Sequence, residues 1–247
     1  MKLSELKEKE TRLKLVQWGE SKAGKSYRAA SAAAFGPVYI FDFDGNIQRT
    51  IADYEGHPLF DKIEADVYNN PKDPESVKVA VEKKLEEIEA SIKAGKPKYA
   101  TIVFDSWTAW QQIVLEAIMG PRRQGGKPES VDWQRNASYQ RYVINKIFNG
   151  FRPLNIIVNC HVKWIKDEQL GMISPELNAY GQVALNLHRF SNELHWLDYK
   201  NGKHLVKVVP DNRIKAYTDL KPLPNKGLME DTSLAPFKEL AFTLSEE

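Results

Sequence analysis

The chain has 247 residues, a formal net charge of +2, 42% hydrophobic residues and 28% charged residues. That length can bury a large core in one α/β domain, and the composition is typical of a globular protein. The small net charge excludes an overall basic field for nucleic acid, so any such contact has to be local. The single cysteine, Cys160, excludes an internal disulfide and is compatible with a reducing compartment.

No apolar run approaches the roughly 20 residues that span a bilayer. The segment Met1–Glu10 is charged and lacks the apolar core of a signal peptide. The sequence therefore predicts a cytoplasmic protein without membrane contact. It also predicts one domain over residues 1–247, with a charged segment at 1–10 and an irregular tail at 221–247.

The first half of the chain alternates predicted strands and helices. Arg12–Trp18 alternates polar and apolar residues as a strand does, and the alanine-rich stretch Lys25–Ala34 favours a helix. Val38–Asp42 is apolar without alternation, which is typical of a strand covered on both faces. Glu75–Ala94 has apolar residues at helical spacing, and Tyr99–Asp105 predicts another buried strand.

The second half continues the pattern and ends in a hairpin. Two helices and a fourth buried strand are predicted over Trp107–Met119, Trp133–Asn149 and Leu154–Cys160. Asn201-Gly202 is a strong two-residue turn signal between the strands Ser191–Tyr199 and Lys203–Val209. Strands alternating with helices predict an α/β fold with a mostly parallel sheet, helices on both faces and a C-terminal β-hairpin.

The most specific motif is the phosphate-binding loop G-E-S-K-A-G-K-S between the first strand and the first helix. Its backbone N–H groups can surround a phosphate chain, while the lysine reaches the β/γ-phosphates and the serine hydroxyl binds Mg²⁺. The alternative is a glycine turn with an exposed lysine. The sequence therefore predicts binding of ATP and Mg²⁺ by Gly19, Glu20, Ser21, Lys22, Ala23, Gly24, Lys25, Ser26 and Tyr27.

Three aspartates follow predicted strands, where ligands bind in parallel sheets. Asp105 ends an apolar strand and is predicted to hold Mg²⁺, although an acid there can also cap the next helix. Alternation would place Asp42 and Asp44 on one face of their strand. Asp44 is the predicted general base for water and Asp42 a metal-shell acid, so that the predicted metal set is Ser26, Asp105 and Asp42. A simple turn at Asp44-Gly45 is the alternative.

His161 follows the fourth buried strand. From that position its imidazole can contact the γ-phosphate and report hydrolysis to the next segment. A hydrogen-bonded histidine near the core is the alternative. The predicted catalytic set is Lys25, Asp44, Asp105 and His161.

In order, these motifs resemble the RecA-type recombinase core. Within it they are similar to the phage nucleotide-binding, AAA-like ATPases of the single-strand-annealing (Sak) kind. The resemblance spans about Leu13 to His161 and rests on Gly19–Ser26, Tyr39–Gly45, Ile102–Ser106 and Ile156–His161. It implies that Asp44 stands where the family usually has a water-activating Glu. His161 stands where the family commonly has a sensor Gln.

The resemblance also implies single-stranded DNA bound by two loops, which correspond to Pro121–Asp132 and Val162–Gln182. The predicted DNA-binding residues combine basic and aromatic side chains, which suits phosphate tracking and base stacking; they are Arg122, Arg123, Lys127, Lys163, Trp164 and Lys166. Solvated basic loops are the alternative. The implied partners further include copies of the same chain, in a ring or filament, and a single-stranded-DNA-binding protein.

The leading functional hypothesis is an ATP-hydrolysing, single-stranded-DNA-binding protein of phage-type recombination. A nucleotide-gated replication or recombination accessory protein with little catalysis is the second. The third is a small-molecule kinase whose lid is Gly120–Lys127. Candidates for a cation supplied by a neighbouring subunit are Arg189, Arg213 and Lys215.

Overall fold

The structure is a computed structural model, and it describes residues 12–121, 123–166, 171, 173–211, 214–219, 228–230, 233–241 and 243. In this part of the chain a nine-stranded sheet has the order β3-β2-β4-β5-β1-β7-β8-β9, and β6 pairs with β5 outside that path. The strands from β3 to β7 in this order pair in parallel, whereas β6, β8 and β9 pair antiparallel. Their bounds are β1 (Lys14–Gly19), β2 (Val38–Asp42), β3 (Ile63–Val67), β4 (Thr101–Asp105), β5 (Asn155–Lys166), β6 (Ile173–Leu177), β7 (Glu193–Lys200), β8 (Lys203–Lys207) and β9 (Leu228–Met229).

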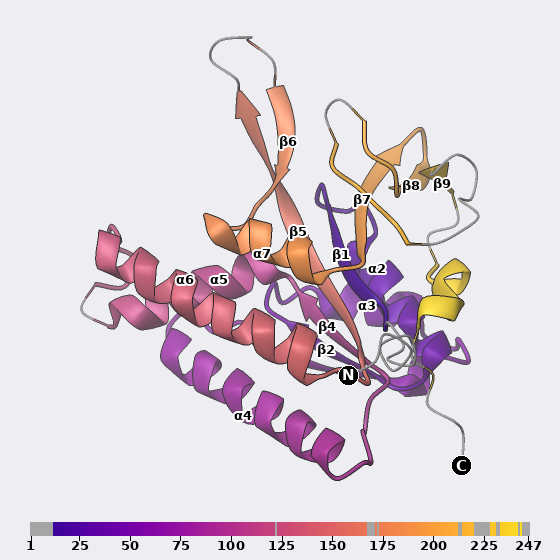
Figure 1. The fold of residues 1–247 in the computed structure, drawn as a ribbon, viewed down its shortest axis with the longest axis horizontal. Helices are drawn as coiled ribbons and strands as arrows, with labels where there is room; N and C mark the ends of the chain where they lie inside the picture. The colour runs from indigo at the N-terminus through magenta and orange to yellow at the C-terminus, as the bar shows by residue number, and fades with distance from the viewer. Residues whose placement is uncertain are drawn as a thin grey trace, which may run out of the picture.

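Helices cover both faces of the sheet (Figure 1). One face packs against α4 (Pro74–Lys93), α5 (Trp107–Met119), α6 (Ser130–Asn145) and α7 (Gln182–Phe190). The other face packs against α2 (Lys25–Ala30), α3 (Ile47–Asp53) and the 3₁₀ helices η1 (Ser31–Phe35) and η5 (Ala235–Leu240). A short 3₁₀ turn, η2 (Phe60–Lys62), precedes β3, and the π-helical turn η3 (Lys146–Gly150) continues α6. None of the described helices is long and apolar enough to cross a bilayer.

Local chemistry explains where the longer helices begin and which face they bury. The Asp73 carboxylate caps α4 by accepting the Ser76 N–H at 3.1 Å, and Pro74 occupies the first turn. The Ser106 hydroxyl caps α5 by accepting the Ala109 N–H at 3.2 Å. Both helices bury apolar side chains at helical spacing, among them Val81 and Trp110. The Ser106 cap starts α5 directly after the end of β4, where Asp105 lies.

The end of β1 lies unusually close to β7. Gly19 has φ +154°, and a Cβ atom there would lie 2.1 Å from the Leu197 carbonyl oxygen. Only glycine permits that contact, since the oxygen belongs to the backbone and cannot be displaced by a side-chain rotation. The close approach therefore fixes where the chain leaves the sheet.

The predicted fold class is confirmed. The sheet is mostly parallel, helices cover both faces, and β7 and β8 form the C-terminal hairpin around Asn201 (φ 53°) and Gly202 (φ 77°). One predicted boundary is wrong in a way that matters: the fourth strand does not end at Cys160, because β5 continues to Lys166 and pairs with β6. His161 therefore lies within a strand.

Other differences have simple physical reasons. All of β1 is buried despite its alternation, because both faces of this central strand are covered. The predicted helix Lys25–Ala34 becomes 3₁₀ from Ser31 onward, where the hydroxyl of Ser31 accepts the Leu234 N–H at 3.0 Å. The segment 1–10 lies outside the described residues. The described part of the predicted irregular tail contains β9 and η5, with Phe237 fully buried.

Gly19→Ala should lower the free energy of unfolding by about 3 kcal/mol, because it adds a backbone clash to an unfavourable φ. The measurement is urea denaturation. Gly95→Ala is the matched control: its φ is +71° and nothing lies within 4 Å of an added Cβ. That control should lose only about 1 kcal/mol. Equal losses in the two variants would contradict the role assigned to the contact with Leu197.

Candidate functional site

Polar side chains form one row across five neighbouring parallel strands of the buried sheet, at the carboxyl ends of β2 and β4, near the end of β1 and within β5 and β7. In register order they are Asp42, Asp105, Asn159, Gln17 and His195. All five are buried, and the row lies on the face that α2 and α3 cover. Since buried polar groups have to be hydrogen-bonded, the segments that pack over this row have to supply hydrogen-bond partners for it.

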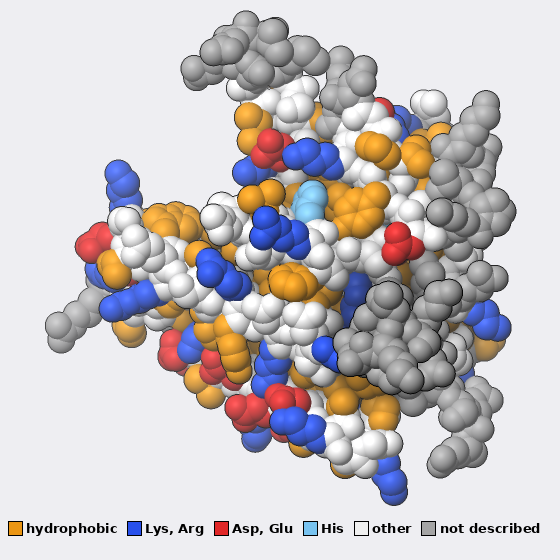
Figure 2. All heavy atoms as spheres, in the orientation of Figure 1, with side chains coloured by type: hydrophobic (Ala, Val, Ile, Leu, Met, Phe, Trp, Pro, Cys, Tyr) orange, Lys and Arg blue, Asp and Glu red, His pale blue; other side chains and the backbone are white. Residues whose placement is uncertain are grey.

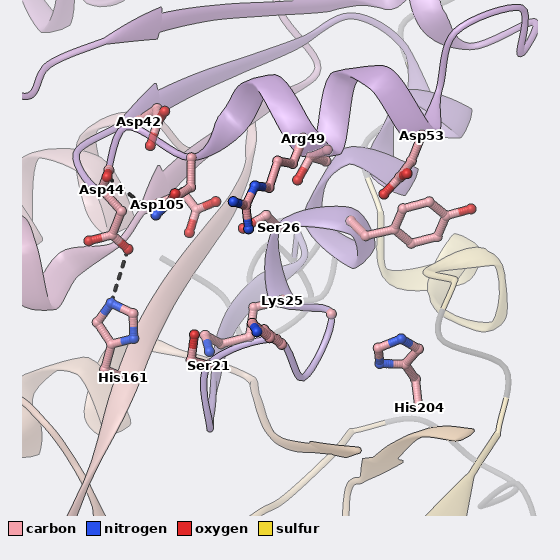
Figure 3. Close-up of a pocket in the computed structure, with 15 residues that line it drawn as sticks. Ser21, Lys25, Ser26, Asp42, Asp44, Arg49, Asp53, Asp105, His161 and His204 are labelled. Carbon is pink, nitrogen blue, oxygen red and sulfur yellow. Dashed lines mark hydrogen bonds and ion pairs between the residues drawn. The ribbon is translucent and has the colours of Figure 1, made fainter. Parts of the chain in front are cut away.

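A cavity of about 500 Å³ opens above this row. Figure 3 shows it as an elongated site, with Asp44 and His161 at one end, Lys25 and Ser26 in the middle, and His204 at the other end. The lining residues come from the phosphate-loop motif and the start of α2, the end of β2 and the loop after it, the end of β4, the middle of β5, α3 and β8. They are Ser21, Lys22, Gly24, Lys25, Ser26, Tyr27, Asp42, Asp44, Asn46, Arg49, Thr50, Asp53, Asp105, His161 and His204.

The loop between β1 and α2 has the conformation that its sequence predicts. Lys22 (φ 66°) and Gly24 (φ 90°) both adopt left-handed backbone angles. A Cβ at position 24 would also lie 3.1 Å from Nδ1 of His204, a tight contact that adds to the preference for glycine there. Among the other predicted nucleotide-binding residues, Gly19, Glu20 and Ala23 do not line the cavity.

The Lys25 amine points back into its own loop. It donates to the carbonyl oxygens of Gly19 at 3.0 Å and Glu20 at 2.7 Å. Burial lowers the pKa of Lys25, although the nearby charge of Asp105 opposes that shift. A buried ammonium that has only carbonyl partners is poised to exchange them for an anionic ligand.

Asp105 lines the cavity at the end of β4. Its Oδ1 accepts the Asn159 side-chain N–H at 2.9 Å, and Ser26 is a second hydrogen-bond partner. Burial raises the pKa of Asp105; the bonds from Ser26 and Asn159 oppose this, and the charges of Asp44 and Asp42 add to it. The negative charge of ionised Asp105 is therefore not fully balanced by its surroundings, and a bound cation would balance it.

Asp42 supports the loop that carries Asp44. Its two carboxylate oxygens accept the backbone N–H groups of Gly45 and Ile47, each at 2.9 Å. The expectation that alternation places Asp42 and Asp44 on one face of a strand is wrong, because β2 ends at Asp42. Asp42 lines the cavity, but both of its oxygens are already used.

Asp44 and His161 form a pair at one end of the cavity. The Nε2 atom of His161 lies 3.0 Å from Oδ2 of Asp44, as Figure 3 shows. Burial by itself would raise the pKa of Asp44, but the hydrogen bond and charge of His161, with help from Ser106 and Lys25, lower it overall. The carboxylate is therefore ionised at neutral pH, as a base for water must be.

The opposite end of the cavity carries the ring of Tyr27, a predicted nucleotide-binding residue, and groups that the sequence did not indicate, among them His204 and Arg49. Tyr27 is 41% exposed and its ring lies 4.9 Å from that of Tyr54, so it offers a flat surface for a planar ligand. The His204 ring packs at 4.7 Å from that of Tyr199 in the hairpin. From α3, Arg49 extends toward Ser26 in Figure 3. The sequence gives only a weak signal for Arg49, because a short loop without a recognisable motif joins β2 to α3.

The predicted DNA-binding residues fall into two groups. Arg122 lies outside the described residues, and Lys127 is exposed. Arg123 is committed to its own loop, since it makes a bidentate ion pair with Asp132 at 2.8 Å for each bond. Lys163, Trp164 and Lys166 belong to strand β5 and not to a loop.

The β5–β6 hairpin projects from the body of the protein (Figure 1). On it, Trp164 is 55% exposed, Lys163 pairs with Glu176 across the hairpin at 3.7 Å, and Trp164 donates from its indole N–H to Glu20 at 2.6 Å. Directly after the first predicted DNA segment, the ring of Trp133 meets that of Tyr180, in the second segment, at 4.7 Å. On the face in Figure 2, basic and acidic side chains are interspersed, which agrees with the small net charge.

Two further expectations concern residues away from the cavity. No described residue of Gly120–Lys127, the predicted kinase lid, lines it. In that segment Gln124 instead donates to the Pro71 carbonyl. Arg189 and Lys215 are exposed and also outside the lining, and Arg213 is outside the described residues. Contributions of these cations to a neighbouring subunit stay a prediction.

The oxygen donors present fit Mg²⁺ brought by a nucleotide. Mg²⁺ is usually bound through one or two carboxylates plus substrate phosphates, and not by a cage of protein groups. Accordingly, the described residues contain no group of three or more His, Cys, Asp or Glu that could hold a metal alone. Ser26 and Asp105 supply a hydroxyl and a carboxylate, and the nearby acids explain why added positive charge would be favourable.

A phosphate-binding loop after the central parallel strand β1, with an acid at the end of β4, which only β5 separates from β1, defines a P-loop NTPase. A family model described as an AAA domain matches residues 11–218, and the chain belongs to that family. No curated protein matches the chain. Among solved structures it is similar to one described as an ATPase domain, with 8% identity, a TM-score of 0.38, and coverage of 85% of this chain and 78% of that chain. At that identity and score, the likeness does not bear on the chemistry of the site.

Lys25→Ala should abolish the thermal stabilisation by ATP while leaving the fold intact. The free protein should melt within about 2 °C of the wild type, because the lost hydrogen bonds are offset by removing a buried charge. In the wild type, ATP at about 100 times its Kd should add about 2.7 kcal/mol of stability. Lys127→Ala, at an exposed position outside the cavity, is the control and should keep the ATP effect. A full ATP effect in Lys25→Ala would refute the site.

Proposed function

We propose that this protein hydrolyses ATP and couples the nucleotide state to single-stranded DNA held by the β5–β6 hairpin. The observation that carries the proposal is the continuity of β5. One strand bears His161 at the cavity and then Lys163, Trp164 and Lys166 on the projecting hairpin. A change at His161 is therefore transmitted along a single rigid element.

The shape of the cavity supports one orientation for the nucleotide. The phosphates would lie on the loop, with the γ-phosphate toward Asp44 and His161 and the base toward Tyr27 and His204. Lys25 would exchange its bonds with the Gly19 and Glu20 carbonyls for bonds with the β/γ-phosphates. Arg49 would add a second cation near the phosphates.

Hydrolysis in this arrangement needs a positioned water and compensated charge. Asp44, ionised through its bond with His161, would orient the water and accept its proton. Mg²⁺ bound by Ser26 and Asp105 would neutralise charge on the phosphates. As Asp44 engages the water, His161 would exchange its bond with Asp44 for one with the γ-phosphate, which links hydrolysis to β5.

The hairpin side chains suit a single-stranded nucleic acid. An exposed tryptophan with lysines on the same projecting element can stack bases and contact phosphates. The contact is local, in keeping with a net charge of only +2. Assembly into a ring or filament, a single-stranded-DNA-binding protein as partner, and a role in annealing or recombination belong to the same proposal.

His161→Ala should move the acid limb of ATP turnover to higher pH. Without the imidazole, burial dominates and the pKa of Asp44 rises, so that the base protonates at a higher pH. His161→Gln, which keeps a hydrogen-bond donor without the charge, should shift less. Turnover measured against pH, with folding verified by circular dichroism, tests the prediction.

Asp44→Asn provides the reference for that experiment. It should lose roughly 10²–10⁴-fold in turnover, the usual contribution of a general base, while binding ATP normally. If Asp44→Asn turned over ATP like the wild type, or if His161→Ala kept the wild-type acid limb, Asp44 would not be the base.

Replacing Lys163 and Lys166 together by alanine should weaken single-stranded DNA binding and reduce its salt dependence. Each phosphate contact contributes about 0.7 to the slope of log affinity against log salt for single strands. The double variant should therefore lose about 1.4 from the slope, and DNA should stimulate its ATP turnover less. Lys96→Ala, an exposed lysine after α4, is the control.

ATP turnover by the purified wild type, with and without single-stranded DNA at several salt concentrations, is the deciding measurement. Stimulation that fades with salt supports the proposal, because counterions compete with phosphate contacts. Turnover indifferent to DNA, or an unchanged salt slope in the lysine variant, would favour a nucleotide-gated accessory protein. In that case the hairpin would bind protein.

A further inference from the structure

Gln17 occupies the centre of the buried polar row and uses its whole side-chain amide. Its Nε2 donates to the Lys25 carbonyl oxygen at 2.7 Å and to Oδ1 of Asn159 at 2.6 Å. Its Oε1 accepts a bond from Arg28 at 2.9 Å. The side chains of Gln17, Asn159 and Arg28 are all fully buried. Gln17 does not line the cavity, so the proposed reaction does not use it directly.

Arg28, Gln17, Asn159 and Asp105 form a chain of hydrogen-bonded side chains, and the two end members fix which atom donates in every bond. The Arg28 guanidinium can only donate, and an ionised Asp105 carboxylate can only accept. Between them, the Gln17 oxygen must face Arg28, and the Asn159 amide nitrogen must face Asp105. The hydrogen-bond chain therefore has one arrangement and not two, and it holds the Asp105 carboxylate in one orientation.

The same hydrogen-bond chain connects the two elements that supply the oxygen donors for Mg²⁺. Ser26 belongs to α2, whereas Asp105 belongs to β4, and β5 separates β4 from β1, the strand that leads into the phosphate-binding loop. Gln17 holds the Lys25 carbonyl, next to Ser26, with one N–H and reaches Asp105 through Asn159 with the other. Ser26 and Asp105 are also hydrogen-bonded to each other directly. A cation that takes both oxygens as ligands would replace that bond, and the chain through Gln17 and Asn159 is the connection that would remain.

We infer that Gln17 is a positioning residue that, through Asn159, sets the separation of the Ser26 hydroxyl and the Asp105 carboxylate for Mg²⁺. This rests on the proposed function, because the cation arrives with the nucleotide. A partner that orients a metal ligand typically changes metal affinity by roughly 10–100-fold. A Gln17 variant should consequently bind the nucleotide but respond poorly to Mg²⁺.

The test separates metal binding from nucleotide binding. A fluorescent ADP analogue is titrated into wild type and Gln17→Met in EDTA, and then at increasing Mg²⁺. We expect the affinity in EDTA to stay within about twofold of the wild type, and the Mg²⁺ concentration for half of the effect to rise at least about tenfold. Thermal stabilisation by ADP with and without Mg²⁺ gives a second readout that does not depend on turnover.

Two further variants keep the outcome interpretable. Gln17→Glu is isosteric and retains the acceptor for Arg28 but removes both donors, so it should show the same Mg²⁺ defect if Gln17→Met does not fold. Gln140→Met removes a buried glutamine from α6, on the other face of the sheet, and should leave the Mg²⁺ response unchanged.

Three results would overturn the inference. They are a wild-type Mg²⁺ response in a folded Gln17 variant, an equal loss of affinity in EDTA and in Mg²⁺, and the same Mg²⁺ defect in Gln140→Met. Each leaves the proposed ATPase intact, provided that the wild type binds the nucleotide. A wild type without any nucleotide binding would overturn the proposed function together with this inference.

Discussion

A row of polar side chains in the middle of a buried sheet is tolerated only if every member has a hydrogen-bond partner. Here the partners are the first turn of α2, the loop after β2 and the neighbouring strands themselves. The requirement thus fixes where the phosphate-binding loop leaves the sheet and where Asp105 points. Apolar packing on the two faces stabilises the sheet, and the polar row holds the side chains that line or support the cavity in fixed positions.

The charges around the cavity are balanced only in part. Burial lowers the pKa of Lys25 and raises that of Asp105, so each group is held in an environment that disfavours its charge. In the proposed function, a nucleotide with its cation would bring both missing partners at once, phosphate oxygens for the lysine and a divalent ion for the carboxylate. Binding therefore relieves an unfavourable arrangement of charge that the fold maintains in the free protein.

The sequence predicted the architecture well because apolar strands and capped amphipathic helices are local patterns, as in Val38–Asp42 and Trp107–Met119, whose bounds agree with the structure. The sequence also indicated the phosphate-binding loop and selected Asp44, Asp105 and His161, which line one cavity in the structure. It missed Gln17 and Asn159, since a single polar residue in a strand becomes informative only when the strand register pairs it with another. It misplaced the end of β5 because the exposed half of that strand has the composition of a loop.

The packing around α2 depends on η5, a segment that lies some two hundred residues later in the sequence. Phe237 in η5 is fully buried, and its ring centroid lies 5.4 Å from the guanidinium carbon of Arg28. Just before η5, the Leu234 N–H donates to the Ser31 hydroxyl, across a sequence separation of 203 residues. During synthesis, the phosphate-binding loop emerges from the ribosome long before the residues that support its helix. The packing around α2 is thus finished only after Phe237 has emerged, late in translation.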